Sequence, residues 1–518
     1  MNQRLLKGAF LLTLAALFTK VLSIVYRIPY QNITGDVGFY IYQQVYPIHG
    51  IIFTLAMYGF PVVIAKFIAE ERNNAFQVLA VSFFVLTVVS VVFCTLLYLF
   101  SPVLANVVGD PGLAPLYRTM SFAVLFVPII SVLRGMFQAR EYALPTALSQ
   151  IVEQLVRVIV IVTLAIYAMQ QGFGVYAAGV GAAAGSIAGA AASAILLIVF
   201  YHKQVQSIRF RLSIPWKRFI PIGKRLLVQG VIISIGALVY VLFQLVDSMT
   251  IIKQLEQFGY SLYEAKRIKG IYDRSQPLLQ LGFALATSLS LVIVPSLALK
   301  HHRSDKWEIL RQAGFAFKVT FIISIAASFG LALIAKPTNE MLFTDSHGSA
   351  LIAAAGTAIF FGSLAFVSIA ILQGMNFVKD TLYVVLFGLV VKGLFNVVFI
   401  PVCGIFAAAI GTVAGFFVMA VHSAIIVHKQ LNMFQAYSFR FFRVLLAVGG
   451  MTVSVFIWKT AIQTYALSFG RLGQAGIALS SVMIAVVVYG CLLLALRVFS
   501  KAELELLKRT REGVEREN

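Results

Sequence analysis

The sequence is poor in charged residues and in cysteine. Asp, Glu, Lys and Arg make up 12% of its 518 residues, whereas a soluble domain carries roughly 25%. Its three cysteines, Cys94, Cys403 and Cys491, lie far apart in apolar runs, so they predict neither a disulfide framework nor a metal site. Acidic residues are scarcest, at 20 against 41 Lys and Arg. These shortages exclude a soluble enzyme, a disordered chain and a secreted disulfide-rich protein.

Long apolar runs dominate instead. Hydrophobic residues make up 60% of the chain, and its mean hydropathy is +0.91. A membrane-spanning helix needs about 20 mostly apolar residues, so we expect an all-α polytopic membrane protein. The sequence predicts fourteen spans, at 9–30, 45–67, 77–99, 118–137, 147–169, 174–200, 226–250, 277–299, 316–335, 350–373, 381–401, 404–427, 442–463 and 475–497.

The motifs of covalent chemistry are missing as well. The sequence has no P-loop, no HExxH and no paired carboxylates in a plausible cleft. The glycine series at 179–189 follows no strand, so it indicates helix packing rather than a dinucleotide loop. We therefore expect no enzyme, no cofactor and no metal. Any transport would draw its energy from the membrane potential or from a gradient of H⁺ or Na⁺.

The positive charges predict the orientation of the chain. Loops and short flanks on the same side of the membrane as the termini contain 27 Lys and Arg. The loops on the other side of the membrane contain 7. The positive-inside rule therefore places both termini in the cytoplasm. The basic connection 201–225 is the natural joint between two halves, and we expect a solvated inner loop that contacts anionic lipid rather than a specific binding site. We expect no nucleic acid as a partner.

The two halves resemble each other. Segments 174–195 and 404–425 are identical at ten of 22 positions, and Arg134-Gly135-Met136 matches Gln373-Gly374-Met375. This pattern favours a duplicated six-helix unit in parallel orientation, the kind of repeat that rocks about a central site. The predicted parts are an N-lobe at 1–200, the linker 201–225, a C-lobe at 226–430, spans thirteen and fourteen at 431–500, and a charged tail at 501–518.

Ionisable residues inside spans are costly and mark candidate functional sites. Lys20 and Arg27 are seven residues apart and are predicted to share a helix face, although Arg27 alone could reach the outer interface. Arg274 follows Asp273 at the start of span eight. The alternative to a functional role is that Arg274 forms a salt bridge in the outer loop. His49 fits a packed core residue as well as a titrating one.

Further polar residues lie inside the remaining spans. Glu153 and Arg157 are one helical turn apart and are predicted to neutralise each other. Lys392 and Asn396 are also one turn apart, and Asp247 lies at the outer end of span seven. Embedded cations outnumber embedded anions, which predicts an anionic substrate. Guanidinium groups suit phosphate or pyrophosphate in particular, because they offer a planar donor fork.

Two segments resemble a known family. Residues 7–43, KGAFLLTLAALFTKVLSIVYRIPYQNITGDVGFYIYQ, resemble the first helix and loop of the SpoVB-like polysaccharide transporters of Gram-positive bacteria. Residues 272–298, YDRSQPLLQLGFALATSLSLVIVPSLA, resemble the eighth helix of MurJ-type flippases. Both groups belong to the MOP flippase superfamily, which also contains the MATE exporters. The resemblance covers essentially the whole chain.

The resemblance implies two six-helix lobes around a cationic cavity, with spans thirteen and fourteen forming a groove for a polyprenyl tail. Arg274 matches the cavity arginine of span eight, and Lys20 matches one of span one. A second arginine of span one aligns nearest Tyr26, one residue before Arg27. The span-two arginine has no basic counterpart here, and His49 is the nearest candidate.

The leading hypothesis is a flippase in a bacterial cell membrane for an undecaprenyl-pyrophosphate-linked glycan, in the first place lipid II. Lys20, Arg27, Arg274 and His49 would bind the anionic headgroup. Asp273, Asp247, Glu153, Arg157, Lys392 and Asn396 would support the cavity. The expected partners are the lipid-linked oligosaccharide, membrane lipids and cell-wall synthesis enzymes, and we expect a monomer.

Four alternatives stay open. A capsular, teichoic or spore-cortex precursor could replace lipid II. A MATE-type antiporter would have twelve spans and cavity carboxylates. A membrane glycosyltransferase or polymerase would have a large acidic or metal-binding outer loop, and the fourth alternative is a non-transporting scaffold for cell-wall enzymes.

Overall fold

A computed structural model describes residues 3–71, 74–204, 216–284, 286, 306–432, 440–466 and 469–499. Throughout these ranges the regular structure is helical. Twelve helical segments in them are long and apolar enough to cross a membrane. The chain is therefore an all-α polytopic membrane protein, as predicted.

The twelve segments account for the predicted spans with two differences. One segment, Leu14–Glu70, covers both the first and the second predicted span. The eighth predicted span, 277–299, lies largely outside the described residues, as do most of the 201–225 linker and the 501–518 tail. The split predicted at Pro401 and Gly404 is confirmed, because α16 (Val378–Cys403) ends there and α17 (Phe406–Leu431) follows.

The first two spans are joined differently from the predicted loop. Helix α1 (Gln3–Val25) is followed at once by α2 (Arg27–Thr54), a π-turn at Leu55–Gly59 and α3 (Phe60–Glu70). Gly35 interrupts α2 with φ +68° and ψ −174°, a backbone conformation that glycine adopts readily. Lys20 and Arg27 therefore lie on opposite sides of a helix junction rather than on one continuous helix.

Contacts divide the chain into two compact units, each described separately here. Unit 1 is Met1–Pro277 with Val385–Gly411, and unit 2 is Leu278–Val384 with Thr412–Asn518. After α3, unit 1 contains α4 (Ala75–Leu99), α5 (Ser101–Val108), 3-10 turns at Pro111–Leu113 and Phe122–Phe126, α6 (Ala114–Ser121), α7 (Val127–Ala139), α8 (Leu144–Gln170), α9 (Gly174–Gln204), α10 (Trp216–Phe258), α11 (Leu262–Asp273) and most of α16.

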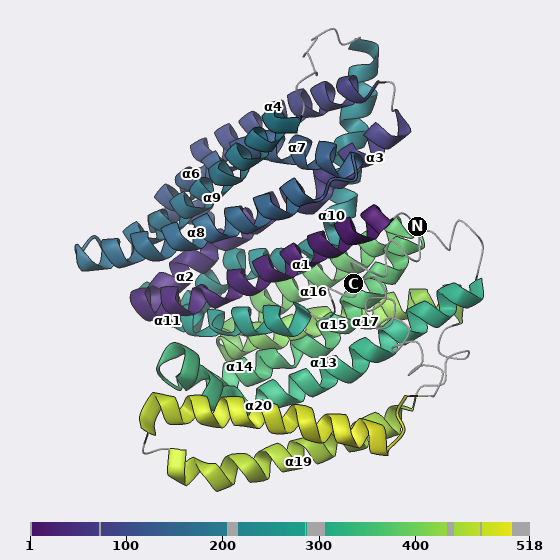
Figure 1. The fold of residues 1–518 in the computed structure, drawn as a ribbon. Helices are drawn as coiled ribbons and strands as arrows, with labels where there is room; N and C mark the ends of the chain where they lie inside the picture. The colour runs from purple at the N-terminus through teal and green to yellow at the C-terminus, as the bar shows by residue number, and fades with distance from the viewer. Residues whose placement is uncertain are drawn as a thin grey trace. The chain divides into compact units, whose positions relative to one another are not determined.

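Small residues bring α8 and α9 together in unit 1, where the two helices lie side by side (Figure 1). A Cβ added at Gly185 would lie 2.6 Å from the Ile161 side chain, and one at Gly189 would lie 2.5 Å from the Glu153 carbonyl oxygen. Side chains larger than hydrogen at these positions would push the helices apart. This close packing fixes the part of α8 that carries Glu153 and Arg157.

Unit 2 contains α13 (Lys306–Phe343), α14 (Ser349–Gly356), α15 (Ala358–Gly374), most of α17, α19 (Phe441–Ala466) and α20 (Gly470–Ala495). Pro337 interrupts α13 and cannot donate to the Leu333 carbonyl. The Nζ of Lys459 on α19 donates to that carbonyl at 2.9 Å instead. Helices α19 and α20, drawn in yellow, pair with each other (Figure 1). Large apolar side chains on the two helices, such as Ile457 and Met483, are exposed.

The lobe boundaries at 1–200 and 226–430 stay a prediction. One local feature is common to the two matched segments. Gly174, at the start of the first, has φ +82°, and Gly404, at the start of the second, has φ +65°. Both positions thus need the left-handed conformation that favours glycine.

Candidate functional site

A cluster of tyrosines surrounds two arginines inside unit 1. Tyr26, Tyr30, Tyr42 and Tyr46 are all buried, and their rings pack against one another near the junction of α1 and α2. The Arg27 side chain is 0% exposed, and its guanidinium carbon lies 4.0 Å from the centroid of the Tyr46 ring. Arg27 is therefore a cation stacked on an aromatic face, not a side chain that reaches the membrane interface.

The Arg27 guanidinium contacts aromatic rings but lacks hydrogen bonds to the described residues. Within the described residues, none of its three nitrogens has a hydrogen-bond partner. The described ion pairs do not include Arg27 either. Because burying an unpaired charge is expensive, this group is a strong candidate for contact with an anion.

Arg157, on α8, belongs to the same cluster. One of its terminal nitrogens donates to the hydroxyl oxygens of Tyr26 and Tyr42, at 3.1 Å each, and those two hydroxyls also bond to each other. The guanidinium carbon of Arg157 lies 5.9 Å from the centroid of Tyr46. Arg27 and Arg157 thus contact the same aromatic ring.

The predicted pairing of Glu153 with Arg157 is wrong. Glu153 instead binds Arg134 of α7, with 2.8 Å between the guanidinium nitrogen and the carboxylate oxygen. Arg134 also donates to the hydroxyls of Ser149 and Ser193, at 3.0 Å each. Spacing along α8 allows a pair with Arg157, but α7 brings Arg134 to the Glu153 carboxylate and two serine hydroxyls help to hold it there.

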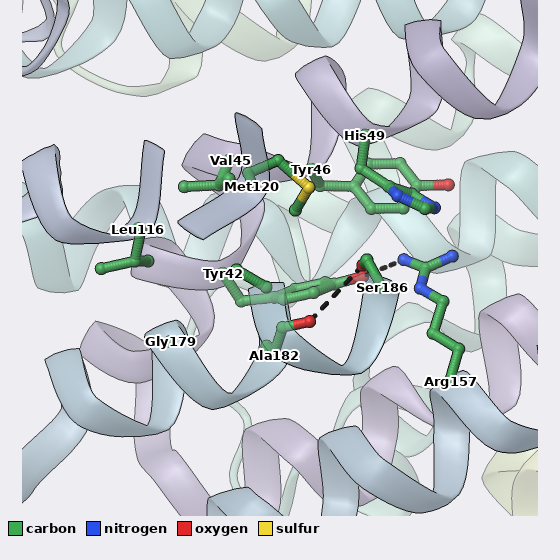
Figure 2. Close-up of a pocket in the computed structure, with 11 residues that line it drawn as sticks. Tyr42, Val45, Tyr46, His49, Leu116, Met120, Arg157, Gly179, Ala182 and Ser186 are labelled. Atoms are coloured by element: carbon green, nitrogen blue, oxygen red, sulfur yellow. Dashed lines mark hydrogen bonds between the residues drawn. The ribbon is translucent and has the colours of Figure 1, made fainter. Parts of the chain in front are cut away.

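A small pocket lies beside the cluster, with about 10 Å³ open to the centre of a water molecule, roughly the space that one water needs. Its surface is mostly apolar, and its walls also include Tyr42, Tyr46 and His49 of α2, Arg157 of α8 and Ser186 of α9. Figure 2 shows His49 and the Arg157 guanidinium on one side of it, with the Tyr42 hydroxyl bonded to Arg157. The ring of His49 is 6.3 Å from that of Tyr46, and neither of its nitrogens has a partner among the described residues.

Arg274 has a carboxylate partner that the sequence analysis missed. Its Nε and one terminal nitrogen donate to the two carboxylate oxygens of Asp36, at 2.8 Å each. Asp36 follows the break at Gly35 and lies so close to α11 that a Cβ on Gly270 would be 2.0 Å from its carbonyl oxygen. Asp273, expected beside Arg274, pairs instead with Lys269 at 2.8 Å.

The polar residues of α10 and α16 form a separate group in unit 1. The Asp247 carboxylate binds Lys392 Nζ at 2.6 Å, the Asn396 amide at 2.9 Å and the Tyr272 hydroxyl at 2.9 Å. Lys392 also donates to the Ala408 carbonyl at 2.8 Å. The structure therefore brings Asp247, Lys392 and Asn396 together in a charge-balanced group.

Lys20 lies half-buried on α1, and the Ser23 hydroxyl donates to its carbonyl oxygen at 2.7 Å. The residues that sequence reasoning missed are Asp36, Arg134 and the four tyrosines. The tyrosines could have been found, because Tyr26 and Tyr30, like Tyr42 and Tyr46, have the four-residue spacing of one helix face.

Long apolar helices that enclose a buried cluster of donors define a multi-pass membrane protein with a polar interior. The family model described as "Polysaccharide biosynthesis protein" matches residues 5–301. The chain therefore belongs to the polysaccharide biosynthesis protein family, in agreement with the resemblance drawn from its sequence.

Curated relatives from Bacillus subtilis (strain 168) cover most of the chain. The uncharacterized membrane protein YabM is 37% identical over 418 residues, which are 80% of this chain and 78% of YabM. The lipid II flippase MurJ is 25% identical over 88% of this chain and 89% of MurJ. Stage V sporulation protein B is 25% identical over 97% of both chains.

The fold matches a solved member of the superfamily. The inward closed conformation of a lipid II flippase MurJ aligns with a TM-score of 0.66 over 93% of this chain and 98% of that one, at 14% identity. This likeness confirms the MurJ-like fold expected from the sequence.

Proposed function

We propose that the chain is a flippase that moves an undecaprenyl-pyrophosphate-linked glycan from the inner to the outer leaflet by alternating access. The observation that carries the proposal is the buried pair of arginines, Arg27 and Arg157, which no carboxylate neutralises within the described residues. Buried positive charge of this kind attracts an anion and repels a cation. Similarity to a lipid II flippase over most of the chain supports lipid II as the first substrate to test.

In this proposal Lys20, Arg27, Arg274 and His49 bind the anionic headgroup. Arg274 uses its two-pronged donor geometry on Asp36 in the resting state and exchanges that carboxylate for pyrophosphate oxygens when the substrate binds. The balanced Asp247 group holds α10 against α16. The exposed apolar faces of α19 and α20 offer a surface for the polyprenyl chain.

The proposed protein acts as a monomer with both termini in the cytoplasm, and its two lobes rock about the site. The membrane potential, an H⁺ gradient and an Na⁺ gradient are equally compatible with the proposal as sources of energy for transport. A precursor of capsule, teichoic acid or spore cortex is the second candidate, favoured by similarity to stage V sporulation protein B. A MATE-type cation antiporter is disfavoured, because two buried arginines repel its substrates.

The test is complementation in a bacterium depleted of its own lipid II flippases. The measurement is the accessibility of lipid II to a probe outside the cell. We expect rescue with outward-facing lipid II. If the well-inserted protein fails to rescue, lipid II is the wrong substrate, and the same assay is repeated with the other lipid-linked precursors.

Variants in the same cells test the site. Arg274→Ala should abolish flipping without loss of inserted protein, and Lys20→Ala should do the same. Arg274→Lys should be partly impaired, because lysine lacks the planar donor fork. Arg118→Gln is the matched control, since Arg118 is an exposed arginine bonded to Ser101 at 3.1 Å and outside the site. Wild-type flipping in both alanine variants would contradict the proposed headgroup site.

A further inference from the structure

One buried carboxylate in unit 1 collects partners from several parts of the chain that the sequence places on the outer side of the membrane. Asp110 lies between predicted spans three and four, and Tyr40 lies between spans one and two. Tyr176 lies at the outer end of span six, and Lys266 lies in the connection 251–275. Asp110 is 1% exposed, so its charge needs the partners that these segments bring.

The predicted N-lobe alone prepares this carboxylate. The Tyr176 hydroxyl of α9 lies 2.9 and 2.8 Å from the two carboxylate oxygens of Asp110. The Tyr40 hydroxyl of α2 donates to one of them at 3.2 Å, and the backbone N–H of Gly112 donates to the other at 3.1 Å. Asp110 therefore keeps three neutral donors whatever the rest of the chain does.

The charged partner comes from the predicted C-lobe. Lys266 of α11 lies with its Nζ 3.0 Å from a carboxylate oxygen of Asp110, and it donates to the Tyr176 hydroxyl at 2.8 Å. The Lys266 side chain is 12% exposed. Water can therefore solvate the ammonium when this contact opens, and the contact can form and break without leaving a bare charge on either side.

Helix α11 packs across the boundary between the predicted lobes. It belongs to the predicted C-lobe, yet it lies against α2 of the predicted N-lobe, and both helices are part of unit 1 (Figure 1). The approach is so close at Gly270 that a Cβ there would lie 2.0 Å from the Asp36 carbonyl oxygen. Lobes that rock apart on the outer side must therefore lift α11 from α2 and break the contact between Lys266 and Asp110.

The inner side has a weaker counterpart. Arg225, the last residue of the predicted linker, binds Glu70 of α3 at 3.0 Å and stacks on the Phe67 ring at 4.7 Å. The side chains of this pair are 47% and 40% exposed, so water screens their attraction. The outer contact, with its buried carboxylate, is the firmer of the two.

We propose that Lys266, Asp110 and Tyr176 form a latch that holds the outer side closed and that opens each time the chain turns outward. The proposal rests on the alternating access proposed above and adds the contact that controls it. A contact made in only one of two conformations shifts the balance toward that conformation. Removing Lys266 should therefore favour the outward-open form.

The first test measures opening without any lipid substrate. Ser248 of α10 is 1% exposed, and its carbonyl accepts a hydrogen bond from Gln44 of α2 at 3.2 Å, so it lies where α2 and α10 meet. Intact cells carry the full chain with Ser248→Cys and with its three native cysteines replaced by alanine. The measurement is the rate at which a membrane-impermeant thiol reagent, added outside, labels the variant.

Adding Lys266→Met should raise this labelling rate about tenfold or more, because one charge-assisted contact that favours closure is lost. Methionine keeps most of the apolar length of the side chain. Lys253→Met is the matched control, since Lys253 is an exposed lysine of the same connection and lies outside the latch. Its labelling rate should equal that of the parent chain.

A second variant guards against misfolding. Tyr176→Phe keeps the ring but removes the hydroxyl that joins Asp110 to Lys266. Labelling should rise again, by less than for Lys266→Met, because the ion pair remains. Thermal unfolding of the purified variants identifies those that are folded. If Lys266→Met does not fold, Tyr176→Phe decides, and an unchanged labelling rate in the folded variants would overturn the latch.

The second test locks the latch. In the cysteine-free chain, Asp110→Cys/Lys266→Cys is treated with a short thiol-specific cross-linker that a reductant cleaves. Outward flipping should be lost after treatment and return after reduction. Asp110→Cys/Tyr176→Cys joins two residues of the predicted N-lobe, so its flipping should be the same before and after treatment.

The two tests separate the latch from the identity of the substrate. Faster labelling of Lys266→Met in a chain that fails to flip lipid II would support the latch while the substrate assignment falls. Undiminished flipping by fully cross-linked Asp110→Cys/Lys266→Cys would overturn the latch and leave the transport activity standing.

Discussion

Two groups of buried charges in unit 1 differ in how they are balanced. In the first group each cation has a carboxylate partner and lies outside the proposed headgroup site: Arg134 with Glu153, and Lys392 with Asp247. In the second group Arg27 and Arg157 share aromatic rings and tyrosine hydroxyls. The first group therefore holds helices together, whereas in our proposal the second binds the negative charge of the substrate, because no carboxylate in the described residues forms an ion pair with it.

The difference has an energetic basis. Removing one member of a buried ion pair leaves an uncompensated charge, which costs about 3–5 kcal/mol. Removing a cation that has no carboxylate partner leaves no such charge behind. Substitutions in the two groups should therefore have opposite signatures, with lost stability in the first group and lost binding or transport in the second.

The largest effect is expected for Arg134→Ala. This change leaves Glu153 buried without its cation and frees the hydroxyls of Ser149 and Ser193. We expect the protein to lose about 3–5 kcal/mol of stability. The measurement is the thermal unfolding curve in detergent, together with the yield of inserted protein.

The double variant Arg134→Gln/Glu153→Gln is the control for charge. It removes both charges and keeps polar side chains of similar length, so most of the stability should return. If the double variant were as unstable as Arg134→Ala, packing rather than charge would explain the loss.

Arg27→Met should have the opposite signature. Methionine fills the space over Tyr46 without a charge, so the stability should change by less than about 1 kcal/mol or rise. Outward flipping should fall about tenfold or more, because one charge-assisted contact to the headgroup is lost. The two quantities are measured on the same preparation, by unfolding and by lipid accessibility.

A folded Arg27→Met variant with full flipping would show that Arg27 is a packed residue only. An unstable variant would show that its stacking on Tyr46 holds the fold. Either result would remove the distinction between the two groups of charges.

Hydropathy and span length were sufficient to predict the helices, because an apolar run of about 20 residues can satisfy its backbone hydrogen bonds in a membrane in few ways other than a helix. The boundary between spans one and two was missed for a local reason. Residues 31–44 contain enough polar side chains to resemble a loop, yet they form a helix that bends only at Gly35. Burial among other helices, rather than local composition, decides their conformation.

The sequence singles out candidate residues for the site, but it does not predict how they pair. Spacing along one helix predicts which side chains are neighbours on that helix, and it therefore paired Glu153 with Arg157. Partners from other helices, such as Arg134 for Glu153 and Asp36 for Arg274, depend on tertiary packing. A single sequence carries no distance information of that kind.

The smallest effect is expected outside the spans, at the start of α11. The Ser261 hydroxyl donates to the Glu264 carboxylate at 2.7 Å and accepts from its backbone N–H, which forms a capping box. The hydrogen bond from the Ser261 side chain, followed by that from its backbone, holds the pKa of Glu264 below its usual 4.5. The cap should therefore stabilise the helix at neutral pH and be lost as the pH falls below about 4.5, through the lowered pKa.

Ser261→Ala should remove this cap, at a local cost of about 1 kcal/mol. The measurement is hydrogen exchange of the first amides of α11, with the amides of α8 as an internal reference. Exchange of the α11 amides, corrected for the intrinsic pH dependence, should quicken in acid for the wild type and already be fast at neutral pH for Ser261→Ala. Because Ser261 is exposed and its partner is not a buried charge, flipping and global unfolding should not change. A global loss of stability in Ser261→Ala would contradict this expectation, because it would mean that the exposed pair stabilises the whole fold as the balanced buried pairs do.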